Sequence, residues 1–251
     1  MSAYKIAMLD ESSTECAITH VLAAPEVARL HLRTRILVLA ANGIPLLHAI
    51  IIGAAFLLPV NWIARAGMAM ALLYLAPPLL SRTIRVVSQV QEGRTEFGGR
   101  NFVRWWCLLQ LQGIFNRFPA FEEFLRIVPG LYSLWLRLWG AKIGRLTYWA
   151  PGTAILDRSF IEIGDDVVFG AGVRLNPHVL ARNEAGKNEL LLATIKIGAG
   201  AIIGGYSLLT AGTEIPAGES TRAHLLSPPF TLWKNGKRIN KQTRETNNRP
   251  A

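Results

Sequence analysis

Two stretches of this sequence repeat each other: IEIGDDVVFGAGVRL at residues 161–175 and IKIGAGAIIGGYSLL at residues 195–209. In both, a bulky apolar residue returns at every sixth position, and a glycine usually follows it. A period of six belongs neither to a helix nor to an ordinary strand. It is typical of a parallel β-helix of hexapeptide repeats, in which three hexads make one triangular coil. The sequence therefore predicts a mainly β fold, in which stacked coils bury a column of aliphatic side chains.

The hexad extends well beyond the two quoted stretches. Its apolar positions, with a slip of two residues and one long interruption, are Ile143, Trp149, Ile155, Ile163, Phe169, Leu175, Ile197, Ile203, Leu209 and Ile215. The glycines that directly follow such positions are Gly144, Gly164, Gly170, Gly198 and Gly204. A side chain there would crowd the tight corner between two short strands, so we expect close approach of backbone at these points. The coiled domain is predicted to span residues 141–222, followed by a basic C-terminal tail at 223–251.

Composition indicates contact with lipid and with an anionic partner. Of the 251 residues 51% are hydrophobic and only 18% are charged, yet the net charge is +10. An excess of positive charge fits nucleic acid, an anionic lipid surface or a phosphorylated cosubstrate, and composition alone does not choose among them. Cys16 and Cys107 have no spacing that suggests a disulfide framework or a zinc site.

Two uncharged runs predict a helical hairpin in a membrane. Residues 36–60 carry no formal charge, and as a helix they would cover roughly 37 Å, more than the bilayer core of about 30 Å. We expect a kink or an unwound end at Gly43, Pro45 and Pro59. The second run, 66–80, would cover only about 22 Å and ends in two prolines, so it is either a tilted partner or a re-entrant arm. The alternative for this region, 36–82, is a buried hairpin of a soluble protein.

Arginines around the hairpin give its orientation. They are Arg29, Arg33 and Arg35 before it, Arg82, Arg85 and Arg94 after it, and Arg65 alone in the turn. By the positive-inside rule both ends face the cytoplasm. We therefore expect a cytoplasmic N-terminal segment at 1–35, with no secretory signal, and a β-helix on the cytoplasmic face of the membrane.

Residues 83–140 interleave aromatic rings with arginines. The rings are Trp105, Trp106, Phe115, Phe118, Phe121, Phe124, Tyr132, Trp135 and Trp139. This pattern of aromatic and basic residues predicts amphipathic helices in the membrane interface, with the rings at headgroup depth. Rings among basic residues also suggest single-stranded nucleic acid binding, but the leucines at helical spacing between them are typical of an apolar helix face.

The repeats at 161–175 and 195–209, with the interruption between them, resemble the hexapeptide-repeat acyltransferases with a left-handed parallel β-helix. The lead-in LYSLWLRLWGAKIG, residues 131–144, resembles more narrowly the membrane-linked members of that family and the related C-terminal domains of some peptide synthetases. The resemblance covers residues 130–222 and says little about residues 1–95. It implies an acyltransferase that uses acyl-coenzyme A as cosubstrate, with no bound cofactor, and a homotrimer with the site between subunits.

The interruption of the repeat is where the resemblance places the chemistry. From Leu175 to Ile197 is 22 residues, whereas three hexads need roughly 18, so an extra loop is expected. His178 lies at its start, and in the family a histidine near this point is the general base. Imidazole suits that role because an ordinary pKa near 6.5 leaves it mostly neutral and able to accept a proton at pH 7. The alternative is a surface histidine beside Pro177.

A general base usually needs a partner that fixes its tautomer. Asp157, in the slip between coils, is the preferred orienting residue, although a turn-forming aspartate is the commoner explanation for that position. Asn176 is a candidate for orienting the loop or binding substrate. A second histidine, His224, follows the last hexad and is a weaker candidate. His48, inside the first apolar run, is expected to be neutral and bonded to the preceding turn.

Small residues along the coils are candidates for contact with the pantetheine arm of the donor. They are Gly204, Gly205 and Ala211, with Lys196, Lys234, Lys237 and Arg238 as candidates for its phosphates. The fold needs these glycines whether or not anything binds, and the tail bases also suit a solvated or lipid-binding extension.

The sequence bears on three rivals to acyl transfer from coenzyme A. Zinc chemistry of the three-histidine type is excluded for residues 141–251, which contain only His178 and His224. A non-catalytic β-helix scaffold at the membrane stays open, because repeat proteins often serve as binding surfaces. So does transfer from a carrier-protein thioester. The favoured function is a membrane-associated acyltransferase that acylates a hydroxyl or amine on a lipid-linked, amphipathic or surface-glycan acceptor, without nucleic acid as partner.

Overall fold

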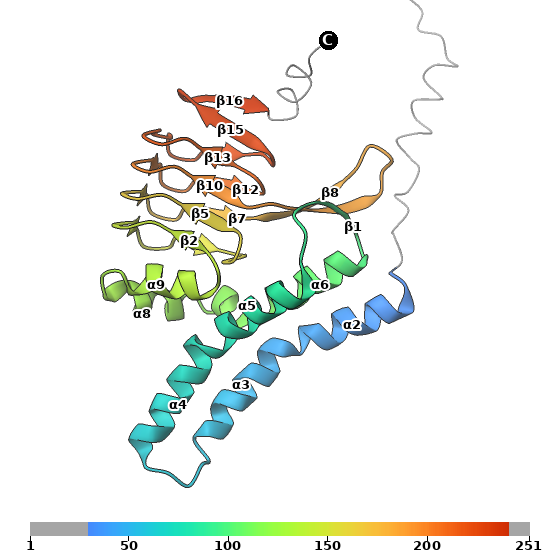
Figure 1. Cartoon of the computed structure of the whole chain (residues 1–251), viewed down its shortest axis with the longest axis vertical. Coiled ribbons are helices and arrows are strands. Elements are labelled where there is room, and N and C mark those ends of the chain that lie inside the picture. The colour runs from blue at the N-terminus through green and yellow to red at the C-terminus, as the bar shows by residue number, and fades with distance from the viewer. Residues whose placement is uncertain (1–29, 241–251) are drawn as a thin grey trace, which may run out of the picture.

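The computed structural model describes residues 30–240, in which a helical half precedes a stack of short strands (Figure 1). The helices are α2 (Leu32–Asn42), α3 (Ile44–Ala55), α4 (Trp62–Tyr74), α5 (Ala76–Ser88), α6 (Arg100–Leu111), α7 (Gly113–Arg117), α8 (Ala120–Ile127) and α9 (Leu131–Leu138). In Figure 1 the ends of α3 and α4 project away from the rest of the molecule, and α5 and α6 lie between this projection and the strands.

The first four helices form two long arms. Leu32–Ala55 and Trp62–Ser88 are each long and apolar enough to cross a membrane, and only 6% and 28% of their most apolar windows are buried. The second arm is longer than the run at 66–80 because Pro77 and Pro78 do not end it. They occupy the first turn of α5, where proline replaces an N–H that would have no helical partner.

Glycine and proline shape the first arm as expected. Gly43 separates α2 from α3, and Pro45 lies in the first turn of α3. His48 was predicted to bond to its own preceding turn, and this is wrong: its Nε2 lies 3.0 Å from the carbonyl oxygen of Leu72. The imidazole therefore links the first arm to the second, because Leu72 belongs to α4.

The strands form three mainly parallel sheets of stacked coils. Sheet 1 has the order β16-β15-β13-β10-β5-β2, sheet 2 has β11-β6-β3, and sheet 3 has β14-β12-β7-β4. Their bounds are β2 (Lys142–Ile143), β3 (Tyr148–Trp149), β4 (Ala154–Ile155), β5 (Ile161–Ile163), β6 (Val168–Phe169), β7 (Arg174–Asn176), β10 (Ile195–Ile197), β11 (Ile202–Ile203), β12 (Leu208–Thr210), β13 (Glu214–Ile215), β14 (Leu226–Ser227), β15 (Thr231–Lys234) and β16 (Lys237–Asn240).

The hexad residues form the buried column of this stack. Ile163 pairs in register with Ile143 in the preceding coil and with Ile197 in the next. The hexad residues exposed by 1% or less are Ile155, Phe169, Leu175, Ile203 and Leu209. Trp149 is partly buried, and its ring stacks on that of Phe169 with the centroids 4.7 Å apart. Consecutive chain segments thus bury one apolar residue per side of each coil.

The five hexad glycines stand where neighbouring coils come closest, as predicted. A Cβ on Gly144 would lie 2.3 Å from the carbonyl carbon of Gly164, and one on Gly198 would lie 2.3 Å from the backbone nitrogen of Ala217. The remaining three meet backbone atoms at 2.3 to 2.5 Å. Because real Cβ contacts are not that short, a side chain at these positions would push two coils apart.

The stack continues past residue 222, where its end was expected. β15 pairs in parallel with β13, and β16 folds back on β15 in antiparallel register. The turn after β14 carries Pro228 and Pro229, so this coil breaks the hexad pattern while still adding a strand. Residues 226–240 therefore belong to the fold. The rest of the predicted tail, 241–251, lies outside the described residues, as do residues 1–29 with Arg29 and Cys16.

Most aromatic rings of the helical half are inside the protein, so their predicted place at headgroup depth is wrong. Trp105 and Trp139 are fully buried, and the exposed fractions of Phe115, Tyr132 and Trp135 are 1%, 2% and 3%. Most of them join the same core cluster as the first coil's Ile143 and Ile155. The open end of a coil stack needs an apolar cover, and α6–α9 supply it. Phe118 and Phe124 stay mostly exposed.

Candidate active site

The interruption of the repeat folds as a β-hairpin. β8 (His178–Arg182) follows β7 after one residue, and β9 (Asn188–Leu192) returns antiparallel to it, with His178 opposite Leu192. A third strand, β1 (Gly93–Glu96), comes from the helical half and pairs with β9. Figure 1 shows this three-stranded sheet reaching sideways from the coils over α6. His178 therefore lies at the junction of coils, hairpin and helices.

The structure brings His178 and Asp157 together. Asp157 lies in the slip between β4 and β5, and its side chain is 1% exposed. Its Oδ2 is hydrogen-bonded to Nδ1 of His178, whose own side chain is 16% exposed. The two residues are 21 positions apart in the chain, about one coil, so the stacking of coils is what places one beside the other.

A third residue, Trp105 of α6, completes this group. Its indole Nε1–H donates to the other carboxylate oxygen of Asp157, Oδ1, at 3.0 Å. Its ring also lies edge-on to the imidazole of His178, with the centroids 4.7 Å apart. Both oxygens of Asp157 are thus engaged, and one side of the imidazole is covered. Sequence reasoning missed this role of Trp105, because the contact joins residues 52 positions apart and leaves no local pattern.

Two opposing effects act on the pKa of His178. Burial lowers it, while the charge of Asp157 and the hydrogen bond to that carboxylate raise it, and the net result is a pKa above the ordinary value of 6.5. In the neutral ring Asp157 accepts the Nδ1–H, which leaves the lone pair on Nε2. Within residues 30–240, no group forms a hydrogen bond with Nε2. The ring nitrogen that can take a proton is therefore the one without a partner among the described residues.

Asn176 lies at the end of β7, two residues before His178 and in register with Thr210 of the next coil. Its Oδ1 is buried and accepts no hydrogen bond from any residue in the described part of the chain. An unsatisfied buried amide oxygen is costly, and such groups often serve a ligand. Its place beside His178 makes it a candidate for contact with substrate.

Buried polar groups hold the segment next to Asp157. Arg158 is 1% exposed, and its guanidinium is paired with Glu122 and donates to Gln112 Oε1 at 3.0 Å and Asn116 Oδ1 at 2.9 Å. Its backbone N–H also donates to Gln112 at 2.8 Å. Glu122 accepts from Tyr132 as well, and burial, then the charge of Glu122, raise the pKa of that phenol. The helices α6–α9 thereby fix the backbone beside Asp157.

The predicted donor-binding residues do not gather in one place. Ala211 follows β12 at the same corner as His178, one coil further, and is buried against Leu191 and Ala193. Gly204 and Gly205 lie at the other end of β12, between sheets 2 and 3. Lys196 projects from sheet 1, in register with Glu162 and Glu214.

His224 lies away from His178. Its backbone N–H donates to the carbonyl of Gly205 at 2.9 Å. Its ring stacks on Tyr206 with the centroids 5.4 Å apart. It therefore belongs to the corner of Gly204 and Gly205. Among residues 30–240, no group of three histidine, cysteine or carboxylate side chains is arranged to hold a metal ion.

Comparison with known proteins gives faint matches. No family model and no curated protein matches the sequence. A galactoside acetyltransferase in complex with coenzyme A aligns at 15% identity over 48% of this chain and 77% of its own, with a TM-score of 0.32. A maltose O-acetyltransferase from Clostridium difficile 630 aligns at 13% identity over 51% of this chain and 86% of its own, with a TM-score of 0.32. A hexapeptide-repeat-containing acetyltransferase from Vibrio cholerae O1 biovar eltor, complexed with acetyl coenzyme A, aligns at 15% identity over 52% of this chain and 86% of its own. Its TM-score is 0.33.

Proposed function

We propose that this protein is a membrane-associated acyltransferase, which moves an acetyl or longer acyl group from coenzyme A to a hydroxyl or amine. The observation that carries the proposal is the His178–Asp157–Trp105 group at the junction of coils and hairpin. A buried carboxylate that orients an imidazole whose other nitrogen is free is the arrangement a general base needs. The stacked coils are, in this proposal, a left-handed parallel β-helix of hexapeptide repeats.

The proposed reaction needs no covalent enzyme intermediate. Nε2 of His178 accepts the proton of the acceptor's O–H or N–H as that atom attacks the thioester carbonyl carbon. The carbon–sulfur bond then breaks, and the proton on Nε2 passes to the departing thiolate, which yields an ester or amide and free coenzyme A. Asp157 stabilises the imidazolium in between, because its carboxylate already holds Nδ1–H.

Other residues have proposed roles in binding. Asn176 Oδ1, without a protein partner among the described residues, accepts a hydrogen bond from an N–H of the donor's pantetheine arm or from the acceptor. Ala211, Gly204 and Gly205 allow the arm to approach the backbone. Because Lys196 and the two glycines lie on different sides of the coil from His178, a complete donor groove needs a neighbouring subunit. This is our reason to propose a homotrimer with the site between subunits.

The two apolar arms support the membrane part of the proposal. They are long enough to span, and most of their surface is exposed. Arg33, Arg35 and Arg82 are exposed near the base of the hairpin, which favours a cytoplasmic location for the coils. Arg85 differs from these exposed arginines, because it is partly buried and its guanidinium lies over the Phe160 ring, 4.5 Å from the centroid. Membrane placement suggests a lipid-linked, amphipathic or surface-glycan acceptor.

The direct test is the binding of acyl-coenzyme A, from acetyl to palmitoyl, to the purified full-length chain by calorimetry. We expect one range of chain lengths to bind with a micromolar to millimolar Kd, as substrates commonly do. Slow thioester hydrolysis should accompany binding. If no coenzyme A thioester binds, the proposal fails in this form, and a carrier-protein donor or a scaffold function takes its place.

A further inference from the structure

A pocket between the two apolar arms and the cap helices, α6–α9, is separate from the His178 group. It has a volume of about 540 Å³, within the range of roughly 300–1,000 Å³ common for ligand sites. The residues that line it are Asn42, Pro45, Leu46, Ala49, Ile52, Leu73, Ile114, Arg117, Phe118 and Phe121. They come from α2, α3 and α4 on one side and from α7, α8 and the residues between them on the other.

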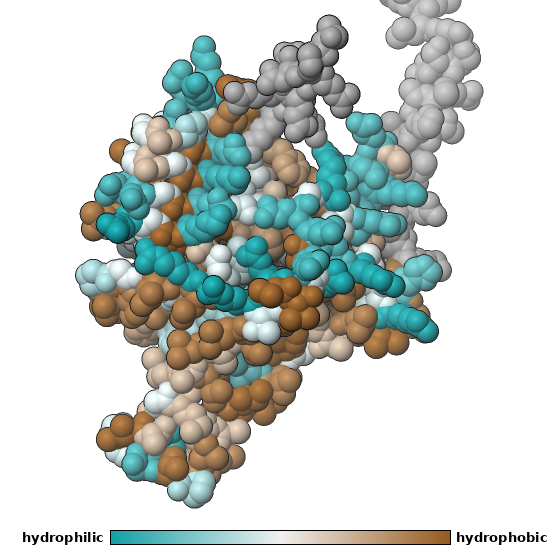
Figure 2. Space-filling model, viewed as in Figure 1, coloured by the Kyte–Doolittle hydropathy of each residue, from teal (hydrophilic) through white to brown (hydrophobic). Residues whose placement is uncertain are grey.

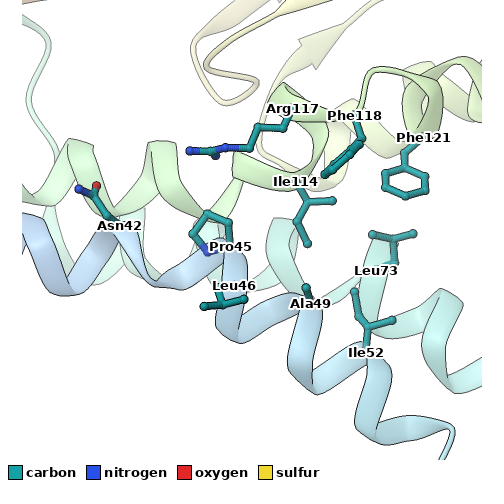
Figure 3. A pocket seen from close by; sticks show the side chains of 10 residues that line it. All are labelled: Asn42, Pro45, Leu46, Ala49, Ile52, Leu73, Ile114, Arg117, Phe118 and Phe121. Carbon is teal, nitrogen blue, oxygen red and sulfur yellow. The ribbon is translucent and has the colours of Figure 1, made fainter.

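The pocket is polar at one end and apolar at the other (Figure 3). Asn42 and the Arg117 side chain, which extends over Pro45, lie at one end, while Ile52, Leu73 and Phe121 lie at the other. A site of this shape matches an amphiphile whose head group lies at Arg117 and whose alkyl chain runs along α3.

The polar end has unused hydrogen-bond donors and a positive charge. Within residues 30–240, Arg117 forms no ion pair, and its one hydrogen bond is from Nη1 to the carbonyl of Gly113 at 3.3 Å. Asn42 Oδ1 accepts from Trp106 Nε1–H at 2.9 Å. This bond fixes the amide and leaves its Nδ2–H₂ for a ligand. A guanidinium beside an amide donor favours an anionic head group with several oxygens, such as a phosphate.

The surroundings of the pocket favour a lipid over a soluble ligand. Leu46, which lines it, is 66% exposed, and Leu47 and Ile50 beside it on α3 are 57% and 58% exposed. Figure 2 shows mostly hydrophobic surface over the lower part of the molecule and a mixed surface with more hydrophilic area above it. An alkyl chain can thus enter this pocket from a bilayer without crossing water.

We propose that this pocket binds one membrane amphiphile, with its phosphate or similar anionic head on Arg117 and Asn42 and its alkyl chain among the apolar side chains of α3, α4 and α8. The inference rests on the membrane part of the proposed function and not on its catalytic part. It assigns the helical half a ligand of its own, and it fits an acceptor that is itself held by a lipid chain.

The test is photolabelling of the full-length chain in phosphatidylcholine vesicles with a diazirine-bearing dodecyl phosphate. Labelled peptides should come from α3, α7 and α8. Ala49→Phe, which places a ring in the pocket, should reduce their labelling about tenfold, while Ala54→Phe, an exposed alanine of the same helix outside the lining, should not. Equal labelling in wild type and Ala49→Phe, or equal loss in both variants, would overturn the inference.

The head group is tested with Arg117→Gln and with the uncharged diazirine-bearing dodecanol. Loss of a charge-assisted contact should weaken labelling by the phosphate about tenfold and leave labelling by the alcohol unchanged. Arg104→Gln, an exposed arginine of α6, is the matched control. The inference also fails if wild type takes phosphate and alcohol equally, or if inorganic phosphate in tenfold excess blocks labelling. If the chain does not bind acyl-coenzyme A but is still labelled as expected, the acyltransferase proposal fails and the pocket proposal stands.

Discussion

Among single residues, Asp157 is the one on which the proposed site most depends. A carboxylate exposed by only 1% is destabilising unless hydrogen bonds replace its water. Here His178 takes one oxygen and Trp105 the other. A residue needed only to form a turn would not require burial with two such partners. The geometry therefore favours an orienting role over the turn explanation that the sequence left open.

Asp157→Asn should change the pH dependence of turnover in a defined direction. The pKa of His178 is raised above 6.5 because Asp157 outweighs burial, so in wild type the base becomes available as the pH rises through a value above 6.5. In the variant burial dominates, and the acid limb of kcat/KM should move to lower pH, with a loss of about 10²–10⁴-fold at its plateau. An acid limb that stays in place would show that Asp157 does not act on the base.

Trp105→Phe should shift the acid limb of kcat/KM to higher pH, opposite to the shift in Asp157→Asn. The phenyl ring keeps the packing but removes the indole N–H, so Asp157 keeps more of its negative charge for His178 and the imidazole pKa rises. We expect a kcat about tenfold lower, with KM for the donor unchanged. Trp106→Phe is the control, because its Nε1–H donates to Asn42 instead. A raised KM for the donor with an unchanged pH profile in Trp105→Phe would assign that residue to packing only.

The sequence allowed part of this site to be predicted. His178 and Asp157 are recognisable because each marks a break in a regular repeat, which is a local signal. Trp105 and Arg158 carry no such signal, since their partners lie 52 and 36 positions away. In a run of aromatic and basic residues, a tryptophan that holds a carboxylate has the same local pattern as one that contacts lipid.

At the scale of elements, periodicity explains what was predictable. Hexads fix the register of each coil on the next, so the column from Ile143 to Ile215 follows from spacing alone. β1 is different, because GRTE at 93–96 has no apolar alternation, and its pairing with β9 joins Arg94 to Leu191 across the chain. The pattern of the cap helices likewise predicted a place in the membrane interface that the structure does not bear out, because it does not identify what covers their apolar face. An amphipathic helix buries its apolar face against protein or against membrane with the same sequence pattern.

Gly198→Ala and Gly67→Ala should have opposite effects on stability. A Cβ at Gly198 would lie 2.3 Å from a backbone nitrogen of the next coil, whereas nothing lies within 4 Å of a Cβ at Gly67 in α4. We expect the first change to destabilise by about 2–3 kcal/mol through overpacking, and the second to be neutral or to stabilise by up to about 1 kcal/mol through helix propensity. Thermal unfolding in detergent measures both. Equal effects would contradict the close stacking of coils.

At the scale of the whole molecule, the two halves depend on each other. The helices cover the first coil and supply Trp105, while the coils supply His178 and Asp157. The sequence indicated two regions of different texture in the right order. It did not show that β1 pairs with β9 or that Trp105 of α6 contacts Asp157. The periodicity of each region carries no information about contacts between the two regions.

The two apolar arms predict how the chain behaves in fractionation if they span a membrane as proposed. Wild-type protein should stay in the membrane pellet through washes with high salt and alkaline carbonate, since two apolar arms of 24 and 27 residues hold it. Leu47→Arg with Ile50→Arg should release it, because each charge costs roughly 2.5–3.5 kcal/mol at the centre of a span. Leu180→Arg with Leu226→Arg, at exposed positions outside the arms, should not. Release of wild type by salt alone would contradict the span.

The most direct measurement is the rate at which coenzyme A thiol is released from an acyl-coenzyme A that binds, for wild type, His178→Ala and His31→Ala. His31 is a matched control, since it is an exposed histidine at the start of α2, outside the proposed site. We predict a loss of about two to four orders of magnitude in His178→Ala, with unfolding temperature and assembly unchanged, and nearly full activity in His31→Ala. Equal rates in all three proteins would contradict the assignment of His178 as the general base.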